Sequence, residues 1–428
     1  MIVCSVLPLA AALHGRDATA TIVDSLRPTL VAARAHLVDS VSAAGHDTPL
    51  ALLVVTGGTE QALLDAWHER QRDVPGEPML LLVHPAHNSL PAALEALAAL
   101  QRTGGRGRIQ MLPVVALGAA MDGGAAALDP HSPAVAELSA AIHDISVWHA
   151  MRDARVGVLG APSDWLVASV PDAAALRRRW GPTIIDADLP EALSRFEENI
   201  DAPIAVTVRV GAKPSAGEPH PADVETAARF EPVLRSIVAE QRLDAVTVRC
   251  FDLVRDAYTS GCLALSSLND RGIVAGCEGD IASTVALLWA KRLTGHIGWM
   301  ANPATADRHT GVIELAHCTV PLSLVEGYEL ATHFESGIGV GIAGTLPAGP
   351  VTLLRLGGDE LQHLWCVDGE ALPTVPRAGR CRTQLDVHVA PEAVGELLDR
   401  PLGNHLVTLA GHHAQHLRRW WHDLIADS

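Results

Sequence analysis

Short apolar runs alternate with stretches of helical periodicity through most of the first 300 residues. This alternation is typical of βα units that build parallel sheets. The N-terminal run 1–10 is predicted to be a first β-strand and not a cleaved signal, because it has no basic leader. The runs 50–56 and 78–84 are predicted to be buried strands, each followed by a helix. The second of these helices is predicted to begin at Asn88 and Ser89.

A long helix is predicted over 131–154, and a fresh series of strands follows it. These strands are expected at 155–161, 183–187, 203–210 and 245–251. After about residue 300, helical periods give way to short β-type runs and one final helix. The β-type runs lie at 338–343, 350–356, 383–389 and 405–409.

This order of elements predicts an α/β protein, with two doubly wound α/β domains followed by a C-terminal β-barrel-like domain. The chain of 428 residues exceeds the size of one hydrophobic core, which agrees with several domains. The predicted domains are 1–153, 154–300 and 301–428.

Composition narrows the class of protein further. A content of 48% hydrophobic and 19% charged residues is typical of a globular protein. The formal charge of −17 makes nucleic acid or an anionic membrane an unfavourable partner. The seven cysteines form no CxxC pair and are expected to be reduced thiols. No apolar run is long enough to span a bilayer, so a cytoplasmic location is expected.

Two carboxylates follow a predicted strand in the segment Cys277-Glu278-Gly279-Asp280, just before a long apolar helix. Open α/β sheets bind ligands at the carboxyl ends of their strands. Asp280 is placed to cap the helix, which explains it without a ligand. Glu278 caps nothing obvious, so a functional role is favoured over a solvated one.

A turn between a strand and a helix holds candidate ligand contacts in the first domain. Thr56, Gly58 and Glu60 belong to the string TGGTE at 56–60, where backbone amides and hydroxyls can meet a ligand. A tight structural turn is the competing interpretation. Asn88 begins the next helix, and N-capping explains it without a ligand.

The string 339–344 satisfies the GxGxxG pattern of nucleotide-binding proteins. That pattern requires a helix to open within the glycines. Pro347 and Pro350 follow it here and forbid such a helix. A dinucleotide site is therefore not expected.

Several strings of the chain, in order, resemble the L-fucose and L-arabinose isomerases and their relatives. The block CEGD, a helix ending in LTG, then WMANP and VIELAHC are similar to the C-terminal half of those enzymes. Further similar strings are TGGTE (56–60), NSLPAALE (88–95), VGVLGAPSDWL (156–166), VRCF (248–251) and GNHLVTLAGHH (403–413). The resemblance spans nearly the whole chain.

The resemblance implies a metal centre and a reaction. In those isomerases a glutamate, a second acid and a late histidine hold a divalent metal, usually Mn²⁺, and these positions fall on Glu278, Asn302 and His405. Asn302 can ligate a hard cation through its amide oxygen, but it cannot accept a proton. The second proton transfer would then fall to Asp280, Glu314 or a water.

His317 matches a histidine that binds metal or substrate in the arabinose branch, against the alternative of a half-buried structural histidine. Asp280 and His317 are expected to orient substrate hydroxyls or to tune the metal from behind its ligands. His412 and His413 are candidates for substrate contact, although tandem histidines are usually incidental.

The expected protein is a homo-oligomeric aldose–ketose isomerase, a trimer or hexamer, acting on a small sugar through an enediol. The family geometry implies that Glu60, His87 and Asn88 complete a site shared between subunits. Two alternatives stay open because of Asn302. One keeps the fold but changes the reaction to epimerase, lyase or sugar-acid chemistry, and the other is a non-catalytic sugar-binding protein.

Overall fold

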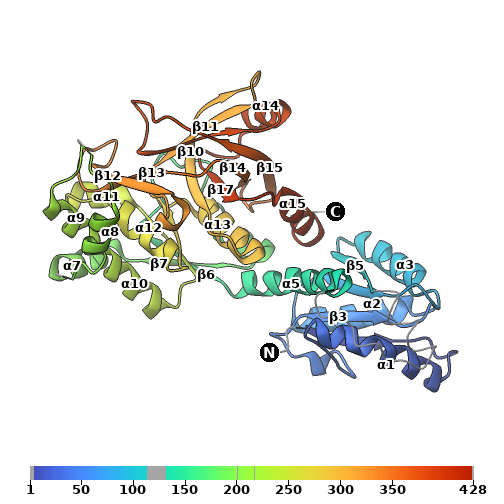
Figure 1. The fold of residues 1–428 in the computed structure, drawn as a ribbon. Helices are drawn as coiled ribbons and strands as arrows, with labels where there is room; N and C mark the ends of the chain where they lie inside the picture. The colour runs from blue at the N-terminus through green and yellow to red at the C-terminus, as the bar shows by residue number, and fades with distance from the viewer. Residues whose placement is uncertain (1–3, 113–131, 200, 216, 427–428) are drawn as a thin grey trace. The chain divides into compact units, whose positions relative to one another are not determined.

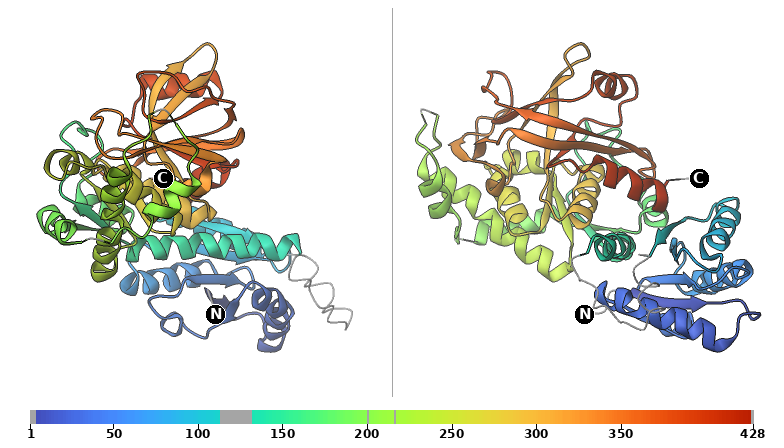
Figure 2. Two further views of the ribbon diagram at one scale, coloured as in Figure 1. Left: turned by 60° about the vertical axis from the view of Figure 1, so that its left-hand side comes forward. Right: turned by 45° about the vertical axis from the view of Figure 1, so that its right-hand side comes forward.

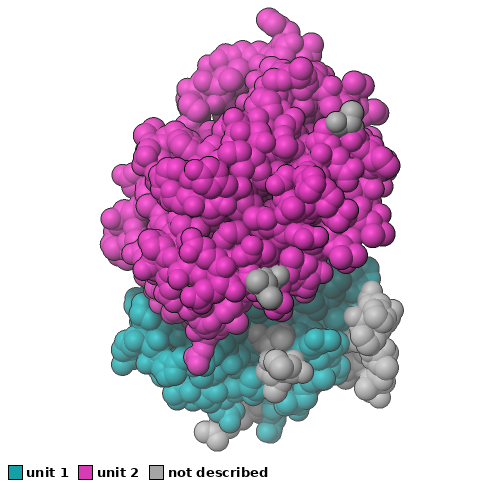
Figure 3. Space-filling model, turned by 90° about the vertical axis from the view of Figure 1, so that its left-hand side faces the viewer, with its two compact units in different colours: residues 1–151, 419–428 teal, residues 152–418 magenta. Residues whose placement is uncertain are grey.

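The computed structural model describes residues 4–112, 132–199, 201–215 and 217–426. Residues 1–3 and 131, which belong to predicted elements, lie outside the described residues. The chain divides into two compact units, one of residues 1–151 with 419–428 and one of residues 152–418 (Figure 3).

The first unit contains a five-stranded parallel sheet with the order β2-β1-β3-β4-β5. Its strands are β1 (Cys4–Leu9), β2 (Ala35–Leu37), β3 (Leu50–Val54), β4 (Met79–Val83) and β5 (Gly107–Met111). Its helices are α1 (Arg16–Ala32), the short η1 (Ser42–Ala44), α2 (Glu60–Asp73), α3 (Ser89–Gln101) and most of α5 (Pro133–Asp153). β3 and β4 are buried at every position, because helices cover both faces of a doubly wound sheet and an unbroken apolar run suits that place.

The second unit begins with a four-stranded parallel sheet with the order β7-β6-β8-β9. Its strands are β6 (Arg155–Leu159), β7 (Thr183–Ala187), β8 (Ala245–Val248) and β9 (Val274–Cys277). Its helices are α6 (Ala173–Arg179), α7 (Leu189–Glu198), α8 (Ala205–Gly211), α9 (Pro221–Ala228), α10 (Phe230–Gln241), α11 (Cys250–Asp256), α12 (Cys262–Asp270) and α13 (Ile281–Thr294). None of the described helices combines the length and the apolar character that crossing a lipid bilayer requires.

One predicted strand is wrong. The segment 203–210 is rich in β-branched residues, but Ala205–Gly211 forms α8. Ala205 and Val208, three residues apart, are buried in the helix, whereas Val206 and Val210 are exposed. Packing of this one helical face outweighs the β propensity of the valines.

The rest of the second unit is a closed antiparallel barrel with the order β10-β11-β16-β15-β14-β17. Its strands are β10 (Trp299–Asp307), β11 (Val312–His317), β14 (Gly349–Gly357), β15 (His363–Leu372), β16 (Thr383–His388) and β17 (Leu406–Ala410). The remaining elements are η2 (Leu322–Leu324), β12 (Gly327–Ala331), β13 (Gly341–Thr345), α14 (Pro391–Asp399) and α15 (Ala414–Leu424). The predicted α/β class is confirmed as two parallel sheets with a separate antiparallel sheet.

Helix α13 explains why the second parallel sheet and the barrel group together. It packs against β8 and β9 of the sheet and also against β14 and β17 of the barrel (Figures 1 and 2). All but three of its fourteen residues are buried, so its apolar surface is shared between the two layers. The structure keeps 152–418 as one unit and groups 419–428 with the first, whereas the sequence predicted a boundary near 300. The division into three domains stays a prediction.

Candidate metal centre

The turn between β9 and α13 directs Glu278 out of the carboxyl end of the parallel sheet. Glu278 has φ +62° and Gly279 has φ +71°, so two successive residues are left-handed. A side chain at Gly279 would lie 2.7 Å from the backbone of Ala161 and Pro162. The left-handed conformation of a glutamate costs about 1–3 kcal/mol and persists where surrounding contacts enforce it, often at functional sites.

Neighbouring backbone groups hold this turn in place. The Ser163 N–H donates to the Glu278 carbonyl oxygen at 2.9 Å, and the Gly279 N–H donates to the Val248 carbonyl at 3.0 Å. The turn at Glu278 and Gly279 is therefore bonded both to the segment that follows β6 and to the end of β8. Its side-chain position follows from the register of parallel strands, as expected at a strand's carboxyl end.

Glu278, His317 and His405 form a buried group of three possible metal ligands. One donor atom from each lies within 4.8 Å of the others. His405 Nε2 is 3.5 Å and His317 Nε2 is 3.9 Å from Glu278 Oε1. His317 ends β11 and His405 precedes β17, so the barrel supplies both imidazoles and the parallel sheet supplies the carboxylate.

The second nitrogen of each histidine ring is already engaged. His405 Nδ1 lies 2.8 Å from Asp280 Oδ2, and His317 Nδ1 lies 2.8 Å from Thr319 Oγ1. When Nδ1–H donates to the Asp280 carboxylate and Nε2 of His405 has lost its proton, Nε2 offers a lone pair to a cation. That buried Nε2 finds no hydrogen-bond partner among the described residues. The donor set and its unpartnered nitrogen fit a divalent transition-metal ion.

Electrostatics at the cluster favour positive charge. Burial alone would raise the pKa of Glu278, but the hydrogen bond to His405 and its charge outweigh burial and, with smaller contributions from His317 and the Trp165 N–H, lower the pKa to about 2. Burial would lower the pKa of His405, but Asp280 and Glu278 raise it to about 9. The negative charges of Glu278 and Asp280 thus favour a positive charge between them, and the same field would stabilise a bound metal cation.

The other histidine stays neutral. Burial and the neighbouring His405 lower the pKa of His317 to about 3. A neutral imidazole can offer its nitrogen to a metal without first losing a proton.

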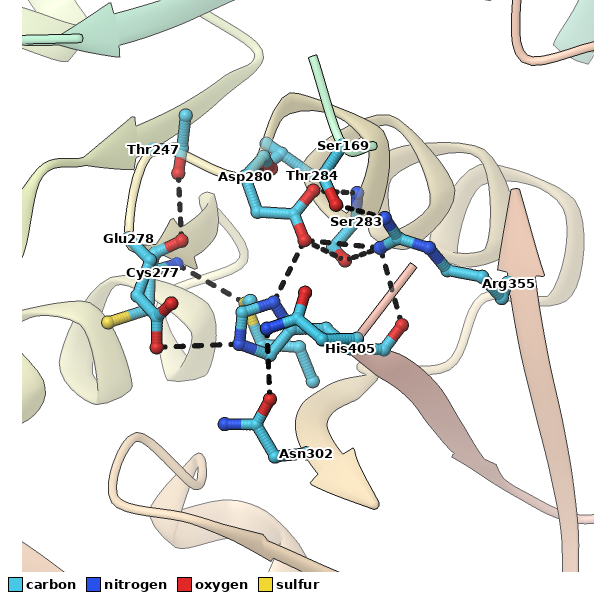
Figure 4. A network of polar contacts seen from close by, with 12 residues as sticks. Ser169, Thr247, Cys277, Glu278, Asp280, Ser283, Thr284, Asn302, Arg355 and His405 are labelled. Carbon is cyan, nitrogen blue, oxygen red and sulfur yellow. Dashed lines mark hydrogen bonds and ion pairs between the residues drawn. The ribbon is translucent and has the colours of Figure 1, made fainter. Parts of the chain in front are cut away.

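Asp280 lies behind His405 and is fully buried (Figure 4). Its Oδ1 accepts from the Ser283 N–H at 2.8 Å, which confirms the predicted helix cap. Its Oδ2 meets Ser283 Oγ at 2.8 Å and Arg355 Nη1 at 3.1 Å as well as His405. A carboxylate without exposed surface has nothing to offer a substrate hydroxyl, so this geometry supports the orienting of His405 instead.

Arg355 belongs to the same network and was not anticipated. It lies on β14, is fully buried, and also bonds Ser169 Oγ at 2.6 Å. Gly403, with φ +139°, leaves room for it, because a side chain there would lie 2.3 Å from Arg355 Nη2. An arginine within an apolar strand run is a signal that could have identified it, since buried arginines require partners.

Asn302 lies next to the cluster on β10. Its neighbour Ala301 pairs with Leu406 across the ladder, which brings Asn302 beside His405 (Figure 4). The Asn302 amide oxygen accepts from Asn404 Nδ2 at 3.2 Å, and the side chain is half-buried.

Glu314, considered for the second proton transfer, is turned away from the cluster. It lies three residues before His317 on β11 and so points to the opposite face of the strand. Arg380 Nη2 is 2.6 Å from its carboxylate, and Arg377 is 3.5 Å away. This pairing gives Glu314 a structural explanation.

His412 lies beyond the opposite end of β17 from His405. Its Nε2 is 3.2 Å from the Gly369 carbonyl and 3.2 Å from Glu370. His413 Nε2 contacts the Ala410 carbonyl at 2.9 Å. Both histidines therefore have local partners away from the metal ligands.

The remaining predicted contacts belong to the first unit. The Thr56 hydroxyl accepts from the Ala11 N–H at 2.9 Å, and Gly58 N–H approaches Glu60 Oε1 at 3.4 Å. Thr59 Oγ1 donates to the Thr56 carbonyl at 2.8 Å, so the turn is braced internally. The participation of these residues in a site shared between subunits stays a prediction.

The interpretation of Asn88 as a helix cap is wrong. Asn88 and His87 are both left-handed, with φ +56° and +52°, and the Asn88 side chain makes no capping bond. Ser89 instead donates its hydroxyl to the Val54 carbonyl at 2.6 Å. The Asn88 side chain therefore takes no part in capping α3.

Sequence reasoning missed three further residues around Glu278. Trp165 donates its indole N–H to Glu278 Oε2 at 2.6 Å. Burial and then the charge of Glu278 raise the pKa of Glu335, and burial lowers the pKa of His333. Glu335 and His333 lie between β12 and β13, and no local pattern links that segment to Glu278.

The fold and the site together define a class: an α/β protein whose parallel sheet and antiparallel barrel converge on a buried carboxylate and two imidazoles suited to a divalent cation. No family model matches the chain. The chain is similar to sulfoquinovose isomerase of Alkalicoccus urumqiensis, with 25% identity over 235 residues, or 53% of each chain. It is also similar to the sulfoquinovose isomerases of Priestia aryabhattai and Priestia megaterium, with 25% identity over 291 residues, or 64% of each chain. The matches thus span between about half and two thirds of these relatives.

Proposed function

We propose that the chain is a metal-dependent sugar isomerase that interconverts an aldose and a ketose. The observation that carries the proposal is the buried Glu278, His317 and His405 group, whose donor atoms lie within 4.8 Å of one another. The similar proteins are named sulfoquinovose isomerases, which supports an isomerase acting on a sugar. Sulfoquinovose isomerase belongs to the superfamily of fucose and arabinose isomerases, and several strings of this sequence resemble those same isomerases.

Glu278, His317 and His405 would hold the ion, and Asn302 would add its amide oxygen. Two imidazoles and a carboxylate suit Mn²⁺ or a similar transition ion. When bound, such an ion polarises the carbonyl and hydroxyl oxygens of an open-chain sugar, which eases formation of an enediol. Asp280 keeps His405 in the orientation that presents Nε2.

The proton transfers fall to carboxylates of this chain. Glu278 is the main proton-transferring group, because its oxygens border the ligand position. Asn302 cannot accept a proton, so a second group is required. Burial, and then the charge of Glu278, raise the pKa of Glu335, which makes Glu335 our candidate for the second group.

The proposal extends to the assembly. A homo-oligomer would bring Glu60, His87 and Asn88 of one subunit to the cluster of another. The left-handed backbone at His87 and Asn88, for which no cap accounts, supports a ligand-binding role for this turn.

The test combines metal analysis with assays on sulfoquinovose, L-fucose and L-arabinose. We expect bound Mn²⁺ or a related ion, loss of turnover after chelation, and recovery on adding Mn²⁺. Glu278→Gln should lower kcat by about 10²–10⁴-fold. Protein that binds no divalent ion would contradict the catalytic proposal. Sugar binding without metal, unaffected by Glu278→Gln, would indicate a non-catalytic binding protein.

Asn302 favours a second candidate, a related reaction such as epimerase, lyase or sugar-acid chemistry. Asn302→Asp distinguishes the two candidates, since it supplies a carboxylate beside His405. Unchanged or lower isomerase activity would support isomerisation as the native reaction. Isomerase activity that appears or accelerates in Asn302→Asp would show that the native reaction differs.

A further inference from the structure

Trp165 is half exposed although it is a large apolar residue, with 50% of its surface accessible. It lies in the segment between β6 and α6, at the carboxyl end of the parallel sheet. Its indole N–H donates to a buried carboxylate oxygen, Glu278 Oε2, at 2.6 Å. Ligand pockets combine apolar aromatic surface with a few placed polar groups. Trp165 offers both, because its N–H bonds a carboxylate while its ring is exposed to solvent.

Contacts of the three residues before Trp165 fix the segment that carries it. The Ser163 N–H donates to the Glu278 carbonyl, so the segment grips both the backbone and the side chain of that residue. Arg249 Nη2 lies 2.9 Å from Asp164 Oδ2, and Arg249 also bonds the Pro162 carbonyl. Arg249 precedes α11 and is itself paired with Asp252 at 3.2 Å. The indole is therefore presented by an anchored loop.

The bond to Trp165 gives the two Glu278 oxygens different partners. Oε2 accepts from the indole, while Oε1 lies 3.5 Å from His405 Nε2 and 3.9 Å from His317 Nε2. The last torsion of a glutamate is broad and roughly two-fold, so a carboxylate without this bond rotates between orientations. A charge-assisted bond of this kind selects one plane and leaves Oε1 facing the imidazoles.

The ring of Trp165 continues into an aromatic wall. Its centroid lies 4.9 Å from that of Phe251 at an interplanar angle of 85°. Phe251 in turn lies 5.5 Å from His333 at 78°. Three rings from three separate segments thus form a row that begins at the indole bonded to Glu278.

We propose that Trp165 is a positioning residue that fixes Glu278 for cation binding and that its exposed ring forms an apolar wall for the C–H face of the sugar. The inference rests on the proposed metal-dependent isomerase. It deepens that function by assigning one side chain to two separable effects. The N–H governs cation affinity and turnover, and the ring governs sugar affinity.

Two substitutions separate these effects. Trp165→Phe keeps an aromatic ring and removes the N–H, so we expect Mn²⁺ affinity to fall about 10–100-fold, as for other groups that orient metal ligands. At saturating Mn²⁺ its kcat should fall while KM changes little. Trp165→Ala removes the ring as well, and KM should rise in addition. Asp164→Asn, which weakens the loop anchor, should lower Mn²⁺ affinity less than Trp165→Phe.

Trp67→Phe is the matched control. Trp67 is also partly buried and donates its N–H at 3.2 Å, but to the Glu77 carbonyl in the first unit. This variant should leave Mn²⁺ affinity, kcat and KM unchanged. A merely structural effect of losing one indole bond would appear equally in both variants.

Calorimetric titration of metal-free protein with Mn²⁺ provides a readout that needs no turnover. If the wild type binds Mn²⁺ but converts no sugar, the isomerase proposal fails, and a weakened Trp165→Phe still supports the positioning role. If the wild type is an active isomerase and Trp165→Phe matches it in Mn²⁺ affinity and kcat, the inference about Trp165 fails alone. A wild type that binds no Mn²⁺ contradicts both.

Discussion

A buried glutamate lies beside histidine in each of the two units, and the two surroundings differ. Glu77 in the first unit and Glu278 in the second are 2% and 7% exposed. Glu77 Oε1 accepts from His149 Nε2 at 2.6 Å and from the Leu50 N–H at 3.2 Å. Its Oε2 pairs with Arg70 Nε. Both oxygens are thus saturated by permanent donors of the same unit.

Glu278 has no such closure. Its Oε2 accepts from the Trp165 N–H at 2.6 Å, but the histidine nitrogens that face Oε1, those of His405 and His317, lie at 3.5 and 3.9 Å, too long for good hydrogen bonds. The buried Nε2 of His405 finds no partner in the described parts of the chain, and the backbone of Glu278 is left-handed. A saturated buried carboxylate stabilises a fold, whereas a strained and incompletely paired one indicates a site that a ligand completes.

Glu77→Gln tests the structural half of this comparison and should have the largest effect on stability. The substitution leaves Arg70 buried without its counter-charge, and breaking a buried pair in this way costs about 3–5 kcal/mol. Urea unfolding followed by circular dichroism measures the change. Mn²⁺ binding should be unaffected in the fraction that remains folded.

Glu278→Gln is the matched control, since it makes the same chemical change at the other buried glutamate. It should lower the free energy of unfolding less than Glu77→Gln does, because His405 keeps its ion pair with Asp280. Equal destabilisation by both substitutions would remove the distinction between a structural and a functional glutamate.

Thr319→Val tests the functional side of the comparison, the candidate metal site at Glu278, and should have the next largest effect. Thr319 holds Nδ1 of His317, so its loss should weaken Mn²⁺ binding about 10–100-fold. Thr408→Val provides the control, because Thr408 is a buried threonine of the same barrel whose hydroxyl finds no hydrogen-bond partner within the described residues. Calorimetric titration with Mn²⁺ should detect a loss in the first variant and none in the second.

Local pattern could predict much of the site. The strand before Glu278 and the cap at Asp280 follow from an apolar run, a turn and a long apolar helix. The resemblance to isomerases added His317 and His405, and the structure brings both to Glu278. These residues lie at the ends of elements whose periodicity is clear, so their placement follows once the elements are recognised.

The remaining parts depend on contacts between distant segments. Arg355 meets Asp280 across 75 positions of sequence, and Trp165 meets Glu278 across 113. No periodicity records such pairs. The helix Ala205–Gly211 shows the same limit, because its valines favour a strand until burial of Val208 decides otherwise. Sequence alone equally fails to distinguish Glu77 from Glu278, since the saturating partners of Glu77 come from three separate segments.

The pH dependence of the free energy of unfolding in acid gives the smallest expected effect and the most specific test of the comparison. Burial would raise the pKa of Glu77, but His149 and Arg70 outweigh it and lower the pKa below the ordinary value of 4.5. A carboxylate with a lowered pKa contributes stability above its unfolded pKa and loses it as pH falls through the folded pKa. Between about pH 5 and pH 3 the wild type should therefore lose stability more steeply than Glu77→Gln, by at most one proton's worth, about 1.4 kcal/mol per pH unit. Unfolding curves measured at several pH values in this window give the two slopes, and the other carboxylates titrate alike in both proteins. Parallel slopes would mean that Glu77 gains nothing from its partners, and saturation of its oxygens would then no longer mark it as structural.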